Sequence, residues 1–145
     1  NSDTKKINVD YQSQIYKIFR ESILKKCDNK IKSEKFISET YKIYDIVNPS
    51  LSQLSAQGLV KIEVSKINSK NPEKQTYISI SLINEDYKSV FLVDHNEEVV
   101  YLQNINGVNI LFETSITLKG NEWFINLDNN ITPLDFNSLL IALSR

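Results

Sequence analysis

The apolar positions before Gly58 follow a helical period. Side chains at this spacing share one face of a helix, so the pattern predicts a helix over about residues 9–26. The polar pair Asp28-Asn29 predicts its end. The stripe consists of Tyr11, Ile15, Ile18, Phe19 and Ile23.

A second helix is predicted after Ser33, which is a suitable N-cap residue. Pro49 predicts its end, because proline biases the preceding residue away from helical geometry. Leu51 and Leu54 then indicate one short extra turn, closed by Gly58. The apolar positions of the second helix are Phe36, Ile37, Tyr41, Tyr44 and Val47.

After Gly58 the period changes to two, which is typical of strands with one buried face. A turn is expected over residues 68–72, a hairpin turn over 94–97, and a further turn over 119–121. The expected inward-facing positions are Val60, Ile62, Val64, Ile78, Ile80, Leu82, Val108, Ile110, Phe112, Thr114, Ile116, Leu118, Trp123, Ile125 and Leu127. The runs 87–93 and 98–103 form the expected hairpin.

The final segment allows two interpretations. Thr132 as N-cap, Pro133 at the first helical position and Asp135 in the first turn favour a helix over residues 133–143. Residues 136–143 could also form a strand.

Helices followed by a meander of strands predict an α+β fold in one domain of residues 1–145. We expect a curved antiparallel sheet with its concave face packed on the helices, in a cystatin-like or nuclear-transport-factor-like cone. Residues 1–8 are expected to be flexible.

The formal net charge of −1 is unevenly distributed. Residues 1–35 hold nine Lys/Arg against five Asp/Glu, whereas residues 90–145 hold two against seven. The asymmetry fits either ordinary solvation of two faces or two opposite poles that orient a partner. It is too diffuse to predict nucleic-acid binding.

Candidate chemistry is sparse. His95, the sole histidine, is expected to be an exposed turn residue, and Cys27, the sole cysteine, a partly buried and inert thiol. One of each cannot supply a zinc tetrad, and no glycine-rich phosphate motif occurs. Glu63 and Glu113 fall on the strand face opposite the apolar positions. We therefore expect a filled core, no cofactor and no enzymatic activity.

Two short motifs carry a family resemblance. Tyr16 to Ser22 reads Y-K-I-F-R-E-S, of the form Y-x-x-x-R-E-S, and Thr132 to Phe136 reads T-P-L-D-F. The first resembles the opening helix, and the second a degraded N-P-L-G-F motif, of the periplasmic domain of the VirB-eight family. That family is the bitopic inner-membrane component of bacterial type IV secretion systems. Asp135 replaces the motif's glycine, which removes freedom at positive φ.

The resemblance implies a periplasmic scaffold that contacts other secretion-channel subunits and forms a dimer. It also implies a single membrane helix and a cytoplasmic tail upstream of residue 1. Arg20 and Glu21 could instead be a solvated pair, with Tyr16 packing locally, and Leu134 and Phe136 could be core. The interface candidates are Tyr16, Arg20, Glu21, Pro133, Leu134 and Phe136.

Two other functions remain open. A small-molecule-binding or isomerase-like cone predicts an open apolar pocket with a few convergent polar groups. An interaction module of an unrelated system predicts the same fold as the scaffold.

Overall fold

The computed structural model describes residues 8–84 and 86–145, and these fall into two units that divide between Lys32 and Ser33. Residues 1–7, for which flexibility was expected, lie outside the described residues. The first unit contains the beginning of helix α1, Gln14–Thr40. The second unit contains the end of that helix and the rest of the fold.

The predicted break at Asp28 and Asn29 is wrong, because α1 continues through both residues and through Ser33, which caps nothing. Asp and Asn cost a helix interior less than about 0.7 kcal/mol each, far less than proline. The neighbouring lysines are good helix formers, so two weak residues do not end the helix.

Pro49 also fails to end its helix. The 3₁₀ turn η1 (Tyr41–Ile43) leads into α2 (Tyr44–Ala56), and Pro49 lies inside α2. Val47 and Leu51, on either side of the proline, are both buried. Their packing holds the two halves of α2 on the core and outweighs the hydrogen bond that proline cannot donate.

The predicted stop at Gly58 is confirmed. Gly58 has a φ of +73°, and its amide donates to the Ser55 carbonyl over 3.0 Å. The Leu59 amide donates to the Leu54 carbonyl over 3.0 Å. These two bonds form a Schellman motif, which satisfies carbonyls at the end of α2.

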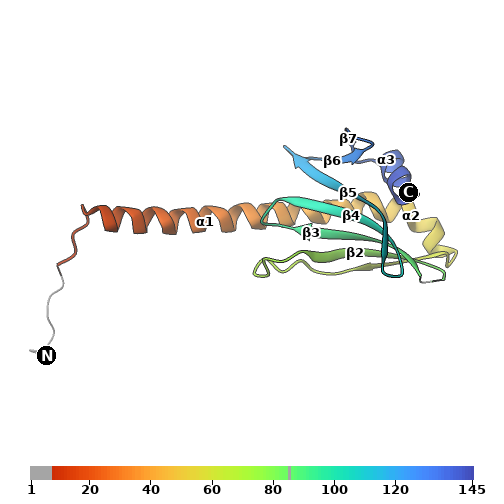
Figure 1. The fold of residues 1–145 in the computed structure, drawn as a ribbon, viewed down its shortest axis with the longest axis horizontal. Coiled ribbons are helices and arrows are strands. Elements are labelled where there is room, and N and C mark those ends of the chain that lie inside the picture. Colours follow the sequence, from red (N-terminus) through yellow and green to blue (C-terminus); the bar gives the residue numbers. More distant parts are fainter. Residues whose placement is uncertain (1–7, 85) are drawn as a thin grey trace, which may run out of the picture. The chain divides into compact units, whose positions relative to one another are not determined.

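The strands form one antiparallel sheet in the order of the chain (Figure 1). The α+β class and the hairpin at residues 94–97 are confirmed, since Asp94 pairs with Val99 across that turn. The seventh strand was not predicted. The strands are β1 (Val60–Val64), β2 (Gln75–Leu82), β3 (Tyr87–Asp94), β4 (Val99–Asn106), β5 (Asn109–Lys119), β6 (Glu122–Leu127) and β7 (Asn130–Pro133).

One face of the sheet and the helices of the second unit enclose the core. Phe36 and Ile37 of α1 and Val47 of α2 pack with the strand residues Phe91 and Ile125. Alternation is confirmed most clearly in β6, where the three predicted inward residues are buried. It fails around the start of β5, where Val108 is 95% exposed and Ile110 is also exposed. Val108 lies in the β4–β5 turn, and the register between β4 and β5 shifts between Asn104 and Ile105, an irregularity that interrupts the alternation.

Tyr77 was assigned to the outer face of β2, but it is only 1% exposed. The register between β2 and β3 shifts between Thr76 and Ile78, which is a local irregularity of the kind that re-aims a side chain. The Tyr77 hydroxyl donates to the Tyr41 carbonyl over 3.0 Å, and the two rings meet edge to face.

Burial raises the pKa of Tyr77 from 10.0 to about 12. The folded state therefore holds this proton more tightly than the unfolded chain. The resulting stabilisation is complete below pH 10 and is lost as the pH rises towards about 12. We expect Tyr77→Phe to lose about 1 kcal/mol at neutral pH with the hydrogen bond, and to show a shallower loss of stability above pH 10. Urea unfolding at neutral and alkaline pH measures both effects, and equal alkaline slopes would contradict the assignment.

The last segment is a helix, α3 (Phe136–Leu143), as favoured, but Thr132 is not its cap. Thr132 and Pro133 belong to β7, and Asp135 is the N-cap residue. Its carboxylate accepts from the Ser138 amide and its amide donates to the Ser138 hydroxyl, each over 2.9 Å. The first of these bonds lowers the pKa of Asp135. With a φ of −136°, Asp135 is in extended backbone, so this turn has no need of the glycine that the family motif carries.

Candidate interaction surfaces

The start of α1 is ordered by local contacts around Tyr16. The Tyr16 amide donates to the Ser13 hydroxyl over 3.1 Å, an arrangement typical of a helix N-cap. The half-buried Tyr16 ring meets the Tyr11 ring edge to face, with 5.1 Å between centroids. Of the sequence-predicted candidates on this helix, Arg20 and Glu21 are exposed. Neither is in a salt bridge in the part of the chain that the structure describes.

The five residues of the apolar stripe are all exposed, Ile15 by 82%. Within residues 8–32 there is no second element on which they could pack. We call Tyr11, Ile15, Ile18, Phe19 and Ile23 the broad stripe.

A second set of exposed residues follows a different spacing on α1. Arg20, Leu24, Cys27 and Ile31 are separated by four, three and four positions, and Tyr16 precedes Arg20 by four. We call Leu24, Cys27 and Ile31 the seam. Cys27 is exposed, so the expectation of a partly buried thiol is wrong. The seam was not predicted from the sequence, although the spacing of its residues along the chain is visible there.

The terminal motif divides between core and surface. Leu134 is buried, and its amide donates to the Trp123 carbonyl over 2.8 Å, so Leu134 is a core residue. Pro133 is exposed, and Phe136 is 55% exposed at the first position of α3. Of the three interface candidates in this motif, Pro133 and Phe136 are therefore available for surface contacts, and Leu134 is not.

The second unit also contains an open groove of about 430 Å³ between one end of the sheet, α2 and α3. It corrects the expectation of a completely filled interior. Its lining is mostly aliphatic, with Lys88 and Arg145 as its cationic members. The principal lining residues are Leu51, Leu54, Val60, Ile80, Leu82, Ile105, Leu111, Leu140 and Leu143.

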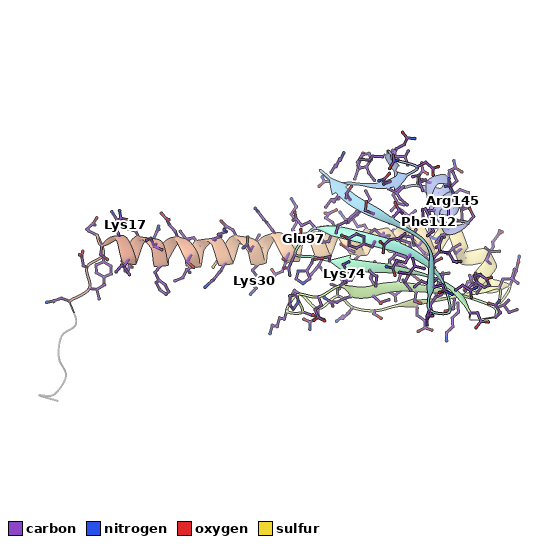
Figure 2. The ribbon with its side chains drawn as sticks, in the orientation of Figure 1. Lys17, Lys30, Lys74, Glu97, Phe112 and Arg145 are labelled. Atoms are coloured by element: carbon purple, nitrogen blue, oxygen red, sulfur yellow. The ribbon has the colours of Figure 1, made fainter. Side chains whose placement is uncertain are left out.

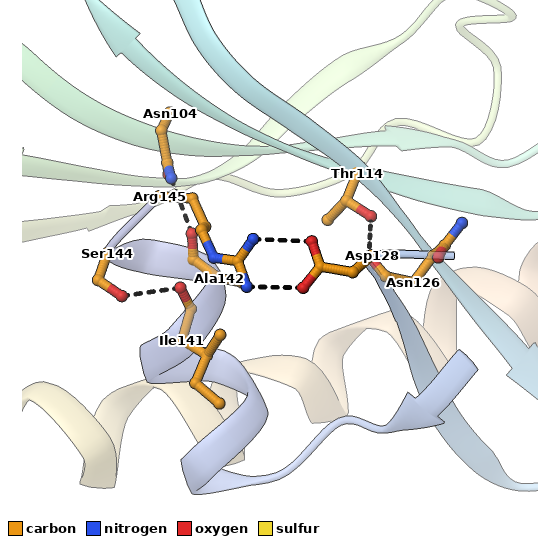
Figure 3. Close-up of polar contacts among 8 residues, drawn as sticks. All are labelled: Asn104, Thr114, Asn126, Asp128, Ile141, Ala142, Ser144 and Arg145. Atoms are coloured by element: carbon orange, nitrogen blue, oxygen red, sulfur yellow. Dashed lines mark hydrogen bonds and ion pairs between the residues drawn. The ribbon is translucent and has the colours of Figure 1, made fainter. Parts of the chain in front are cut away.

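Polar contacts order the residues around this groove (Figure 3). Asn104, only 6% exposed, donates to the Ala142 carbonyl over 2.8 Å and accepts from the Ser89 hydroxyl over 2.7 Å. The Arg145 guanidinium binds both carboxylate oxygens of Asp128 at 2.8 Å. This pairing lowers the pKa of Asp128. The side chain of Asn104, although buried, thus has both its amide nitrogen and its carbonyl oxygen hydrogen-bonded within the protein.

His95 is buried, with 4% exposure, so the expected exposed turn residue is wrong. Its Nε2 lies 2.6 Å from the Asn71 carbonyl oxygen and its Nδ1 lies 3.3 Å from the Ser33 hydroxyl. In the neutral tautomer with Nε2–H, the ring donates to the carbonyl and accepts from the hydroxyl. His95 therefore joins the β3–β4 turn to the 65–74 loop and to α1 by structural hydrogen bonds.

We expect His95→Ala to destabilise the second unit by about 1–3 kcal/mol, because the Asn71 carbonyl and the Ser33 hydroxyl lose their buried partner. Chemical unfolding followed by circular dichroism measures the change. Glu97→Ala, in the same turn but exposed, is the control and should change stability by less than about 0.5 kcal/mol. Equal stability of His95→Ala and the natural chain would contradict the structural role.

The described residues contain no group of three or more His, Cys, Asp or Glu side chains arranged to hold a metal ion. None of the helices in this part of the chain combines the length and the apolar character that crossing a membrane requires. Glu63 and Glu113 are exposed on the outer face, as expected, and Glu113 bonds to Gln103. Comparison of the chain with known protein families, curated proteins and solved structures finds no match.

Proposed function

We propose that this chain is a non-catalytic assembly domain of a bacterial type IV secretion system, on the periplasmic side of the inner membrane. In this proposal the domain is a divergent VirB-eight-like cone of the cystatin or nuclear-transport-factor type. It contacts other channel subunits and a second copy of itself. One membrane-spanning segment of about 20 apolar residues precedes it.

The observation that carries the proposal is the seam. Leu24, Cys27 and Ile31 are exposed apolar or thiol side chains on one line of α1. Tyr16 and Arg20, from the family-like motif, extend that line towards the start of the helix. A surface-exposed line of this kind supports contact with another protein chain.

The spacing of the seam favours helix–helix association. Alternating steps of four and three place residues at the a and d positions of a heptad, which face a partner helix. Arg20 at such a position lowers the stability of the pair but helps to fix its register. With two apolar residues and one cysteine in each helix, the seam supports a weak dimer.

Cross-linking through Cys27 tests this proposal directly. Cys27 is the sole cysteine, so a short bismaleimide can join two chains only at this position. We expect a product of twice the chain's mass, both with the purified protein and on the periplasmic side of intact cells. Cys27→Ser is the control and gives no product. Absence of a dimer in cells that carry abundant protein would reject self-association through the seam.

The groove favours a second candidate function, the binding of a small apolar ligand. Its volume of about 430 Å³ and its aliphatic lining lie in the range of ligand pockets. Saturable binding of a fluorescent aliphatic probe is expected if this function holds. Leu111→Trp fills the groove and should remove that binding, whereas Ile131→Trp, at an exposed site outside the groove lining, should not.

A further inference from the structure

The broad stripe is too wide for a coiled-coil seam. Steps of four residues drift around a helix by about 40° each, at about 100° per residue. The four stripe residues within α1, from Ile15 to Ile23, therefore cover roughly 140° of the helix surface, and Tyr11 lies in the turn before the helix. A strict heptad seam is narrower, whereas an apolar arc of this width is typical of a helix that lies on an extended apolar surface.

Two lysines lie on the same face of α1 as this arc, and two acidic residues lie away from it. Residues 8–32 contain six Lys/Arg and three Asp/Glu. Lys26 and Lys30 continue the face of the broad stripe beyond Ile23, while Glu21 and Asp28 lie on roughly the opposite side of the helix. Of the two lysines that Figure 2 labels on α1, Lys30 continues the face of the broad stripe, whereas Lys17 lies on the side of Glu21 and Asp28.

We propose that the first part of α1 lies on the surface of an anionic lipid bilayer, with the broad stripe immersed among the upper acyl chains. A basic amphipathic helix with a wide apolar face is suited to this position. Lys26 and Lys30 then meet lipid phosphates, and the acidic side chains face water. The two tyrosines, Tyr11 and Tyr16, have the apolar body and polar tip that suit a membrane–water interface.

A second copy of the helix fits this stripe less well than a bilayer does. A partner helix would cover only part of an arc of roughly 140°, whereas a bilayer covers all of it. The basic excess complements anionic headgroups. The seam lies on another side of the helix, so lipid contact leaves it accessible. The inference stands apart from the type IV assignment, since it requires only the helix and an anionic membrane.

Flotation of the purified chain with vesicles tests the inference. One set of vesicles contains phosphatidylcholine alone, and the other contains phosphatidylcholine with phosphatidylglycerol. We expect the chain to float with the anionic vesicles, and to do so less as salt increases. Ile15→Ser combined with Phe19→Ser should weaken this binding at least about tenfold, because two apolar side chains leave the acyl region.

The matched control is Leu24→Ser combined with Ile31→Ser, which changes two exposed apolar residues of the seam and should leave flotation unchanged. Circular dichroism verifies that α1 still forms in both variants. Failure of the natural chain to float with anionic vesicles would overturn the inference, as would equal flotation of the Ile15/Phe19 variant. A lipid-independent dimer that is lost in the Ile15/Phe19 variant would also overturn it, because a second copy would then occupy the stripe.

Discussion

Replacing Phe91 by alanine is expected to destabilise the second unit by about 3–5 kcal/mol. Phe91 is fully buried in the middle of β3 and belongs to the core between the sheet and the helices. Truncation removes apolar burial and leaves a cavity that the surrounding side chains fill only in part. This cost is a large share of the 5–15 kcal/mol by which a domain is usually stable.

Urea unfolding monitored by the fluorescence of Trp123 measures this effect, since Trp123 lies in the same core. Phe136→Ala is the matched control, because it removes the same ring at a position that is 55% exposed. We expect the control to change stability by less than about 1 kcal/mol. A loss of less than about 1 kcal/mol for Phe91→Ala would mean that the helices do not close over β3.

Replacing Leu24 and Ile31 by glutamate should abolish self-association. In a parallel pair, the four glutamates would face one another across the seam, where like charges and lost apolar burial both oppose contact. We expect the dimer to weaken at least about 100-fold, on the order of 3 kcal/mol. Sedimentation of the purified variant and Cys27 cross-linking provide independent measurements.

The control for this variant is Lys25→Glu combined with Lys32→Glu, which adds the same number of acidic residues to α1 outside the seam. It should cross-link like the natural chain, apart from a modest effect of net charge. If the Leu24/Ile31 variant still cross-links through Cys27 with unchanged yield, the seam is not the contact surface.

The sheet could be predicted from the sequence because its signals are local. Alternation in residues 78–82 and 123–127 and the polar turn at residues 94–97 indicate strands and one hairpin without reference to the rest of the chain. The end of α2 was equally predictable, because Gly58 supplies the positive φ that a Schellman motif needs. These features depend on residues that are near neighbours in the sequence.

The unpredicted strand β7 follows a turn that carries a readable signal. Asp128 and Asn129 have φ values of 53° and 65°, and such a pair of positive φ angles is typical of a two-residue hairpin turn. Asp and Asn are among the residues that tolerate this conformation. β7 was missed because it is only four residues long and ends at a proline that also fits a helix start.

The helix boundaries and His95 could not be predicted, because long-range packing decides them. Pro49 stays within α2 because Val47 and Leu51 are held by strands that come later in the chain. His95 is buried because a loop 24 residues away supplies a carbonyl for its ring. Residues whose contacts come from distant parts of the chain give no local sequence signal. The groove could not be predicted for the same reason, because its lining residues come from several elements.

The most direct test of the proposed function is substrate transfer by the secretion system of the host cell, measured with the Leu24→Glu/Ile31→Glu variant in place of the natural chain. We predict that transfer is lost although the protein remains folded and abundant, whereas the Lys25→Glu/Lys32→Glu control supports transfer. Undiminished transfer by the seam variant would contradict the account, since an assembly domain that works through this surface cannot function without it.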